Sequence, residues 1–215
     1  MEIRNEEDKL FQEWIDNTSG ANFVPDGVVN PDEWEKMPIH IVFLLKESNG
    51  FCGDLRTFLN EGGRWMTWNN IARWTYAIRQ KLIKNETPQW ELAKRIYKET
   101  RKYNLRKIAV VNVKKQAGTA VTNTQEMIKA FRKDNKQFLT KQLSLLGKID
   151  CLVCCGNGVA NCYEECISEK LEWQNLHSHI RKTTTKQGTL VIDFFHPQSR
   201  QSSKELFNLF CETIT

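Results

Sequence analysis

Four short apolar runs, rich in β-branched residues, alternate along the chain with longer segments of helical periodicity. Short apolar runs bounded by turn-forming residues are typical of buried strands. The runs cover residues 39–45, 107–113, 149–155 and 189–195. We therefore predict four strands that are buried in one sheet.

The segments between these runs show apolar residues three and four positions apart, which indicates amphipathic helices. The expected helices cover residues 5–15, 65–83, 88–103, 125–146, 156–166 and 203–214. The segments 16–37, 50–63 and 171–187 contain turn formers or polar residues and are expected as loops, with a single helical turn at Pro31-Asp-Glu-Trp.

Strands that alternate with helices predict an α/β domain, a three-layer α/β/α sandwich with a central four-stranded parallel sheet. A chain of 215 residues is long enough to bury a core, and 40% hydrophobic with 27% charged residues is ordinary globular usage. We expect residues 1–215 to form one domain, with the helix and loop of residues 1–37 packed on it.

The chain lacks the apolar run of about 20 residues that would span a bilayer. Its first residues are acidic, whereas a signal peptide begins with a basic and then an apolar segment. We expect a cytoplasmic, monomeric protein without a membrane partner.

The chain has seven cysteines, an odd number, and five of them lie between Cys151 and Cys166. This crowding suits reduced thiols better than a disulfide framework, and it also raises the alternative of a metal site. Because no paired knuckle or matching Cys/His spacing occurs elsewhere, we interpret these cysteines as small buried apolar residues and predict no metal.

The net charge of +5 is modest, but lysine and arginine are concentrated between residues 79 and 148, whereas the N-terminal third is acidic. This asymmetry is compatible with a phosphate-bearing partner such as nucleic acid. Solvated helix faces explain the same pattern equally well.

Three predicted strands end in or near residues that can do chemistry, namely Glu47, Asn112 and His196. The carboxyl ends of parallel strands lie at one edge of a sheet, where ligands bind. Each residue alone has an ordinary interpretation, as a solvated acid, a turn cap and a histidine in a His-Pro turn. Together they are the set that hydrolyses a glycosidic bond: a carboxylate positions water, an amide reads a base edge, and an imidazole hydrogen-bonds the departing base.

From the first predicted strand to the C-terminus, the chain resembles the uracil-DNA glycosylase superfamily, in its bacterial and archaeal iron–sulfur branch. Lys46-Glu-Ser-Asn-Gly resembles the Gly-Glu-Ala-Pro-Gly motif of that branch, and Val110-Val-Asn-Val-Lys-Lys resembles its Thr-Asn-Val-Val-Lys strand. Cys151-Leu-Val-Cys-Cys-Gly-Asn-Gly-Val-Ala is similar to its apolar strand followed by Leu-Gly-Arg-Thr-Ala, and Asp193-Phe-Phe-His-Pro-Gln-Ser is similar to its terminal His-Pro-Ser motif.

The resemblance implies a uracil-DNA glycosylase-like fold and a role for each matching residue. Glu47 would activate water, His196 would stabilise the uracil anion, and Asn112 would read the uracil edge. The target nucleotide would be flipped out of the DNA. The remaining implied residues are Gly50, Phe51 and Asn157 in the base pocket, with Phe51 stacked on the base, and Lys114, Lys115 and Arg200 on the DNA.

The chain also departs from the family pattern. Lys46, Ser48 and Asn49 stand where the family has glycine, alanine and proline, and Gln116 stands at the position of a cluster cysteine. We therefore expect no iron–sulfur cluster and no other cofactor. The last motif lacks the family's apolar wedge, for which Arg200 or Gln198 would substitute, and a single- or double-stranded substrate is left open.

Three functions remain from the sequence. The first is a DNA glycosylase that removes uracil or a modified base. The second is a catalytically inactive nucleic-acid-binding module of the same fold, with a regulatory or defence-related role. The third is an enzyme that acts on free nucleosides or nucleotides in the same pocket.

Overall fold

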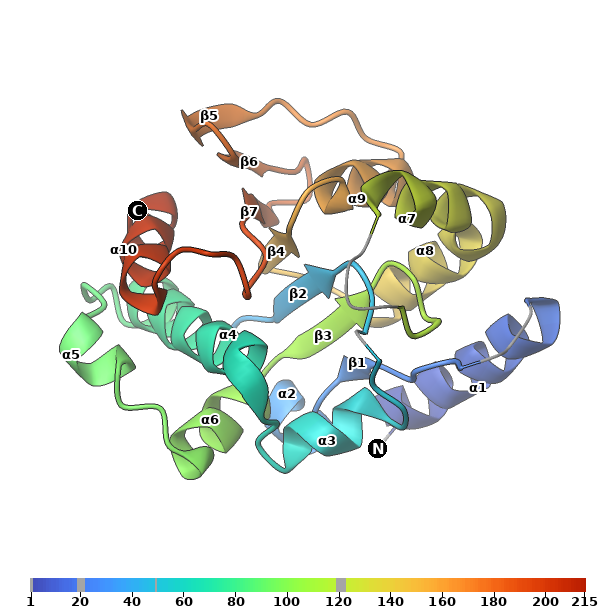
Figure 1. The fold of residues 1–215 in the computed structure, drawn as a ribbon, viewed down its shortest axis with the longest axis horizontal. Helices are drawn as coiled ribbons and strands as arrows, with labels where there is room; N and C mark the ends of the chain where they lie inside the picture. Colours follow the sequence, from blue (N-terminus) through green and yellow to red (C-terminus); the bar gives the residue numbers. More distant parts are fainter. Residues whose placement is uncertain (1, 19–21, 49, 119–122) are drawn as a thin grey trace.

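The computed structural model describes residues 2–18, 22–48, 50–118 and 123–215, in which helices cover both faces of a mixed seven-stranded sheet (Figure 1). The strand order is β1-β3-β2-β4-β7-β6-β5. The strands are β1 (Gly27–Val28), β2 (Ile41–Leu45), β3 (Ala109–Asn112), β4 (Cys151–Cys155), β5 (Gln174–His177), β6 (Ile180–Thr184) and β7 (Leu190–Phe194).

The four predicted strands are the central ones, because β3, β2, β4 and β7 pair in parallel in that order. The prediction of a four-stranded, wholly parallel sheet is corrected, since β1 and the β5–β6 hairpin add antiparallel strands at the two edges. The segment 171–187 gave no strand signal because β5 is exposed on most positions and carries polar side chains. Strand β1 is only two residues long, too short for any periodicity.

One face of the sheet is covered by α4 (Trp65–Ile78) and α10 (Ser203–Thr213), with α3 (Leu55–Asn60), α5 (Trp90–Ala93) and α6 (Lys98–Leu105) beside them (Figure 1). Trp74 is central to this core, because its ring lies 5.2 Å from the rings of both Phe194 and Phe210. A π-helical turn (Arg79–Ile83) continues α4.

Two predictions on this face are corrected. Residues 50–63 contain helix α3, which begins where the Asp54 carboxylate accepts the backbone N–H groups of Arg56 and Thr57. The helix expected over residues 88–103 is divided into α5 and α6.

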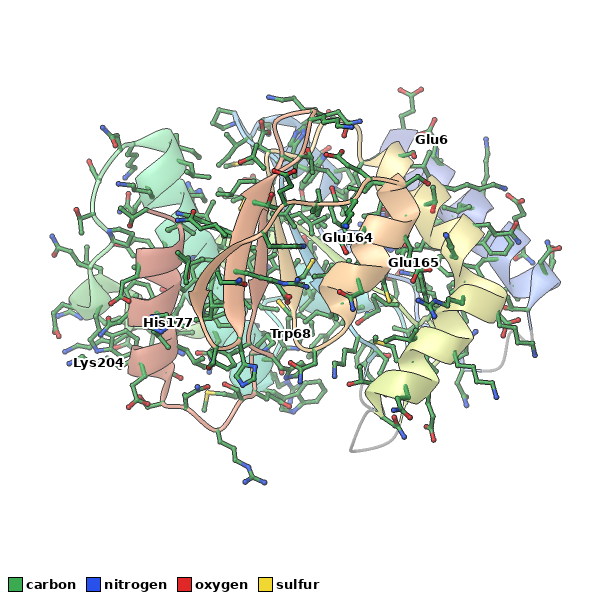
Figure 2. All side chains as sticks on the ribbon, turned by 90° about the horizontal axis from the view of Figure 1, so that it is seen from above. Glu6, Trp68, Glu164, Glu165, His177 and Lys204 are labelled. Carbon is green, nitrogen blue, oxygen red and sulfur yellow. The ribbon has the colours of Figure 1, made fainter. Side chains whose placement is uncertain are left out.

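The opposite face is covered by α1 (Glu2–Asn17), α7 (Thr124–Ala130), a π-helical turn (Phe131–Asn135), α8 (Lys136–Leu145) and α9 (Val159–Ile167). Viewed from above, strands lie between α10, which carries Lys204, and α9, which carries Glu164 and Glu165 (Figure 2). Trp14 of α1 stacks on Phe138 of α8 at 5.3 Å. Its indole N–H donates to Asn135 at 2.9 Å, and Asn135 donates to Ala130 O, five residues earlier, where the helix widens into the π turn.

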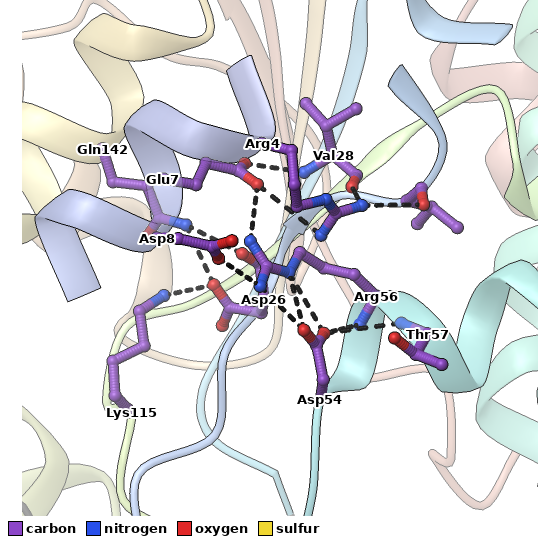
Figure 3. Close-up of polar contacts among 11 residues, drawn as sticks. Arg4, Glu7, Asp8, Asp26, Val28, Asp54, Arg56, Thr57, Lys115 and Gln142 are labelled. Atoms are coloured by element: carbon purple, nitrogen blue, oxygen red, sulfur yellow. Dashed lines mark hydrogen bonds and ion pairs between the residues drawn. The ribbon is translucent and has the colours of Figure 1, made fainter. Parts of the chain in front are cut away.

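Buried charged groups join α1, β1, α3 and the end of β3 (Figure 3). Glu7 accepts the Val28 N–H at 2.9 Å and an Arg56 N–H at 3.0 Å, and both side chains are buried. Asp26 pairs with Lys115 at 2.5 Å, and both are 0% exposed. We call Glu7, Asp26, Arg56 and Lys115, together with their partners Arg4, Asn112 and Gln142, the buried charged cluster. It ties the chain before α2 (Pro31–Glu35) to the sheet.

Candidate functional site

Strands β2, β4 and β7 are neighbours in the sheet, and the residues that follow their carboxyl ends lie at one edge of it. Gly156 follows β4, which lies between the other two strands (Figure 1). A Cβ at Gly156 would lie 3.3 Å from Lys46 Cε and 3.5 Å from His196 Cβ. The structure therefore brings Lys46 and His196 to one edge of the sheet. Because Gly156 has no side chain, both residues can lie close to its backbone.

Glu47 lies next to Lys46 in a buried corner between two loops. Its carboxylate is 5% exposed and pairs with Lys114 Nζ at 2.7 Å. A Cβ at Gly118 would lie 2.1 Å from Glu47 Oε1, so only glycine leaves room for this carboxylate.

Backbone hydrogen bonds extend the β2–β3 pairing beyond the strands and hold this corner. Lys114 N donates to Lys46 O at 2.9 Å, and Gly118 N donates to Ser48 O at 3.0 Å. Residues 46–48 and 113–118 therefore form a continuous support for Glu47.

His196 is held as a neutral imidazole with a defined tautomer. Its Nδ1 accepts the Gln198 N–H at 3.1 Å, so the ring proton is on Nε2. Burial, with a smaller contribution from the positive charge of Lys46, lowers the pKa of His196 to about 4. At neutral pH this side chain is an uncharged hydrogen-bond donor through Nε2.

The low pKa of His196 predicts an acid-side loss of stability. Between pH 6.5 and about 4 the unfolded chain binds a proton at this position and the folded chain does not, so the free energy of unfolding falls as the pH is lowered. The shift corresponds to roughly 3 kcal/mol. Urea unfolding measured across this range should show the slope in wild-type protein and in His179→Gln, and a shallower slope in His196→Gln.

Two residues predicted for the site lie in the buried charged cluster. Lys115 is fully buried against Asp26, with its ammonium 5.0 Å from the centre of the Trp14 ring, and we do not assign it to a DNA contact. Asn112 is buried, and its Nδ2 donates to Asp26 Oδ2 at 3.0 Å. The carboxamide of Asn112 is thus held by Asp26, and we do not assign it to base recognition.

The other predicted residues are placed around the strand ends. Gly50 is exposed and its N–H donates to Gly118 O at 3.2 Å, whereas Phe51 is half-buried and packs on Phe58. Asn157 is exposed in the turn before α9, and Arg200 is exposed in the loop after His196. Asn49 of the first motif lies outside the described residues. DNA contacts of Lys114 and Arg200 stay predictions.

The structure adds two groups that the sequence did not single out for a role. Lys46 Nζ donates to Thr124 Oγ1 at the start of α7 at 2.9 Å, and burial lowers the pKa of this lysine. Ser48 is buried, and its hydroxyl has no hydrogen-bond partner among the described residues. Both residues adjoin Glu47. The only sign of them in the sequence was that they stand where the similar family motif has glycine and alanine.

The clustered cysteines are free thiols, and Cys151, Cys154 and Cys155 are fully buried in β4. Burial raises the pKa of Cys151 to about 12, which keeps this thiol protonated. Within the described ranges, no group of three or more His, Cys, Asp or Glu side chains is arranged to hold a metal ion.

Among the described helices, none is long and apolar enough to cross a membrane.

In comparisons with known proteins, no family model matches the chain and no curated protein matches it.

Proposed function

We propose that this protein hydrolyses the N-glycosidic bond of uracil or a modified base in DNA. The observation that carries the proposal is the placement of a buried carboxylate, Glu47, and a neutral imidazole, His196, at the ends of β2 and β7, on either side of β4. The proposal also rests on the sequence resemblance at both residues.

The two side chains suit the two halves of this reaction. Cleavage of the glycosidic bond leaves positive charge on the sugar and negative charge on the departing base. Glu47 would stabilise the cationic sugar and orient the water whose oxygen bonds to C1′. His196 would donate its Nε2–H to the base anion, and a preorganised neutral donor of this kind stabilises developing charge without giving up its proton.

Neighbouring groups would hold the nucleotide. Lys46 places a positive charge beside both side chains, and it is about half-buried, so its attraction for a phosphate is screened less than that of a surface lysine. Asn157 is an exposed amide at the end of β4 that remains available for a base edge once Asn112 is assigned to Asp26.

One observation favours a second candidate, a nucleic-acid-binding module without catalysis. The Glu47 carboxylate is ion-paired to Lys114, which lowers the negative charge available to a cationic sugar. In this case the same strand ends would bind a base and leave its glycosidic bond intact.

A base-release screen separates the two candidates. Purified protein is incubated with single- and double-stranded oligonucleotides that each carry uracil, one modified base or one mismatch, and free base is measured by mass spectrometry. Release of one base with an abasic site left in the strand supports the glycosylase. Salt-dependent binding without release from any oligonucleotide supports the binding module and contradicts the glycosylase.

A further inference from the structure

Three aromatic rings form a continuous strip from the Glu47 loop to the molecular surface. The ring of Phe51 lies 5.0 Å from that of Phe58, which lies 5.2 Å from that of Trp65. Phe51 and Phe58 pack against the core, whereas Trp65 is 57% exposed and the neighbouring Met66 is 52% exposed. We call Phe51, Phe58 and Trp65 the aromatic strip. It ends in a large apolar ring that faces solvent.

Trp65 is held in this exposed position by a strained and anchored backbone. Its φ of +69° is an outlier for a bulky residue, and such strain persists only where the surrounding structure imposes it. Arg101 supplies that constraint, because its guanidinium donates to the carbonyls of Gly62 and Gly63 and, at 2.9 Å, to Asn69 Oδ1. Trp68, one turn later in α4, is buried (Figure 2).

The start of α4, which carries Trp65, lies beside the loop that follows His196. Asn70 of α4 donates to Pro197 O at 2.7 Å, and the Ser203 hydroxyl lies 3.5 Å from Met66 Sδ. The first turns of α4 therefore run along residues 197–203. A strand whose target nucleotide reaches His196 would pass next to Trp65.

The charges around Trp65 suit a polyanion. Arg64 and Arg200 are exposed, and within the described residues neither guanidinium forms an ion pair. Of the nearby acids, Glu61 is paired with Lys102 at 3.3 Å, whereas Glu205 accepts the Ser202 N–H at 2.9 Å and keeps its negative charge. The exposed ring thus has cationic side chains next to it in the chain and in the adjoining loop.

We propose that Trp65 stacks on an unpaired base next to the target nucleotide, so that the preferred DNA is single-stranded. This inference rests on the proposed function, because it assigns the strand that enters the same site. In a duplex, the faces of each base are covered by its neighbours, whereas in a single strand a base face is available to an aromatic ring. Flat aromatic surfaces bind such bases with little regard for sequence.

The test measures binding separately from base release. Fluorescence anisotropy is recorded with a labelled single strand containing 2′-fluoro-2′-deoxyuridine, which resists hydrolysis, and with its duplex. Trp65→Gly removes the ring and suits the positive φ, so we expect this variant to fold. We expect about a 5- to 100-fold loss of affinity for the single strand, little change for the duplex, and near wild-type binding by Trp65→Phe.

An exposed aromatic residue elsewhere and a substrate change serve as controls. Tyr97→Ala removes an exposed ring from the start of α6 and should bind like wild type. An abasic spacer beside the target should weaken binding by wild type and not by Trp65→Gly. Binding of the single strand by Trp65→Gly within twofold of wild type, or an equal loss on the duplex, overturns the inference.

The outcomes distinguish this inference from the proposed function. Trp65-dependent binding without base release from any oligonucleotide leaves the inference standing and contradicts the glycosylase. Base release by wild-type protein, together with unchanged binding by Trp65→Gly, supports the glycosylase and overturns the inference.

Discussion

Replacing Lys115 with methionine is expected to lower the free energy of unfolding by about 3–5 kcal/mol. The substitution leaves Asp26 fully buried with its main positive partner removed, although Gln142 and Asn112 still donate to it. An uncompensated buried charge is among the most destabilising changes in a protein core. Equilibrium unfolding in urea, followed by circular dichroism, measures the effect.

A double-mutant cycle tests the cause of this loss. Asp26→Asn in the Lys115→Met background removes the second charge and should recover a large part of the stability, because a buried pair replaced on both sides is often nearly neutral. Lys141→Met is the control, because Lys141 and Glu13 form an ion pair in which both side chains are about half exposed and the expected loss is below about 1 kcal/mol. Equal losses at the two lysines would contradict the structure of the buried charged cluster.

Replacing Glu47 with glutamine is expected to lower base release by about 100- to 10,000-fold if the proposed function holds. Glutamine keeps the shape of the side chain and removes the charge that stabilises the cationic sugar and orients water. Affinity for DNA should be kept or increased, since one negative charge near the phosphates is lost. Single-turnover base release and anisotropy, measured on the same oligonucleotide, separate these effects.

Glu172→Gln is the control for this experiment, because it removes an exposed carboxylate in the segment before β5. It should release base at the wild-type rate. A Glu47→Gln variant that retains activity within fivefold of wild type would exclude Glu47 as the catalytic carboxylate. Thermal unfolding of both variants checks that the loss is not a loss of folded protein.

The sequence predicted the features that depend on local patterns. The runs 39–45, 107–113, 149–155 and 189–195 became the four parallel strands because continuous apolar, β-branched residues are sufficient for strands covered on both faces. The sequence also placed a carboxylate and a histidine after two of these strands. Whether they serve the predicted chemistry stays a prediction.

The sequence could not predict contacts set by distant partners. Lys114 and Lys115 are neighbours with the same side chain, yet Lys114 pairs with Glu47 and Lys115 pairs with Asp26, 89 residues away in the chain. From the sequence, Asn112 was available to bind a base. Nothing in the sequence marked Asp26, which precedes the very short strand β1, as its hydrogen-bond partner. Helix α3 was missed because glycines on both sides of it favoured a loop over residues 50–63.

The strand order also determines when the site can exist during folding. Glu47 follows β2, the first strand of the parallel core in the chain, and His196 follows β7, the last. Strand β4 lies between them in the sheet, so the two side chains reach the same edge only after β2, β4 and β7 have paired, and these pairings of long sequence separation form late on loop-closure grounds. The lowered pKa of His196, about 4 in the folded chain, can be followed through its imidazole NMR resonance, which therefore reports when the sheet is complete. Spectroscopic signals from the helices do not report this step.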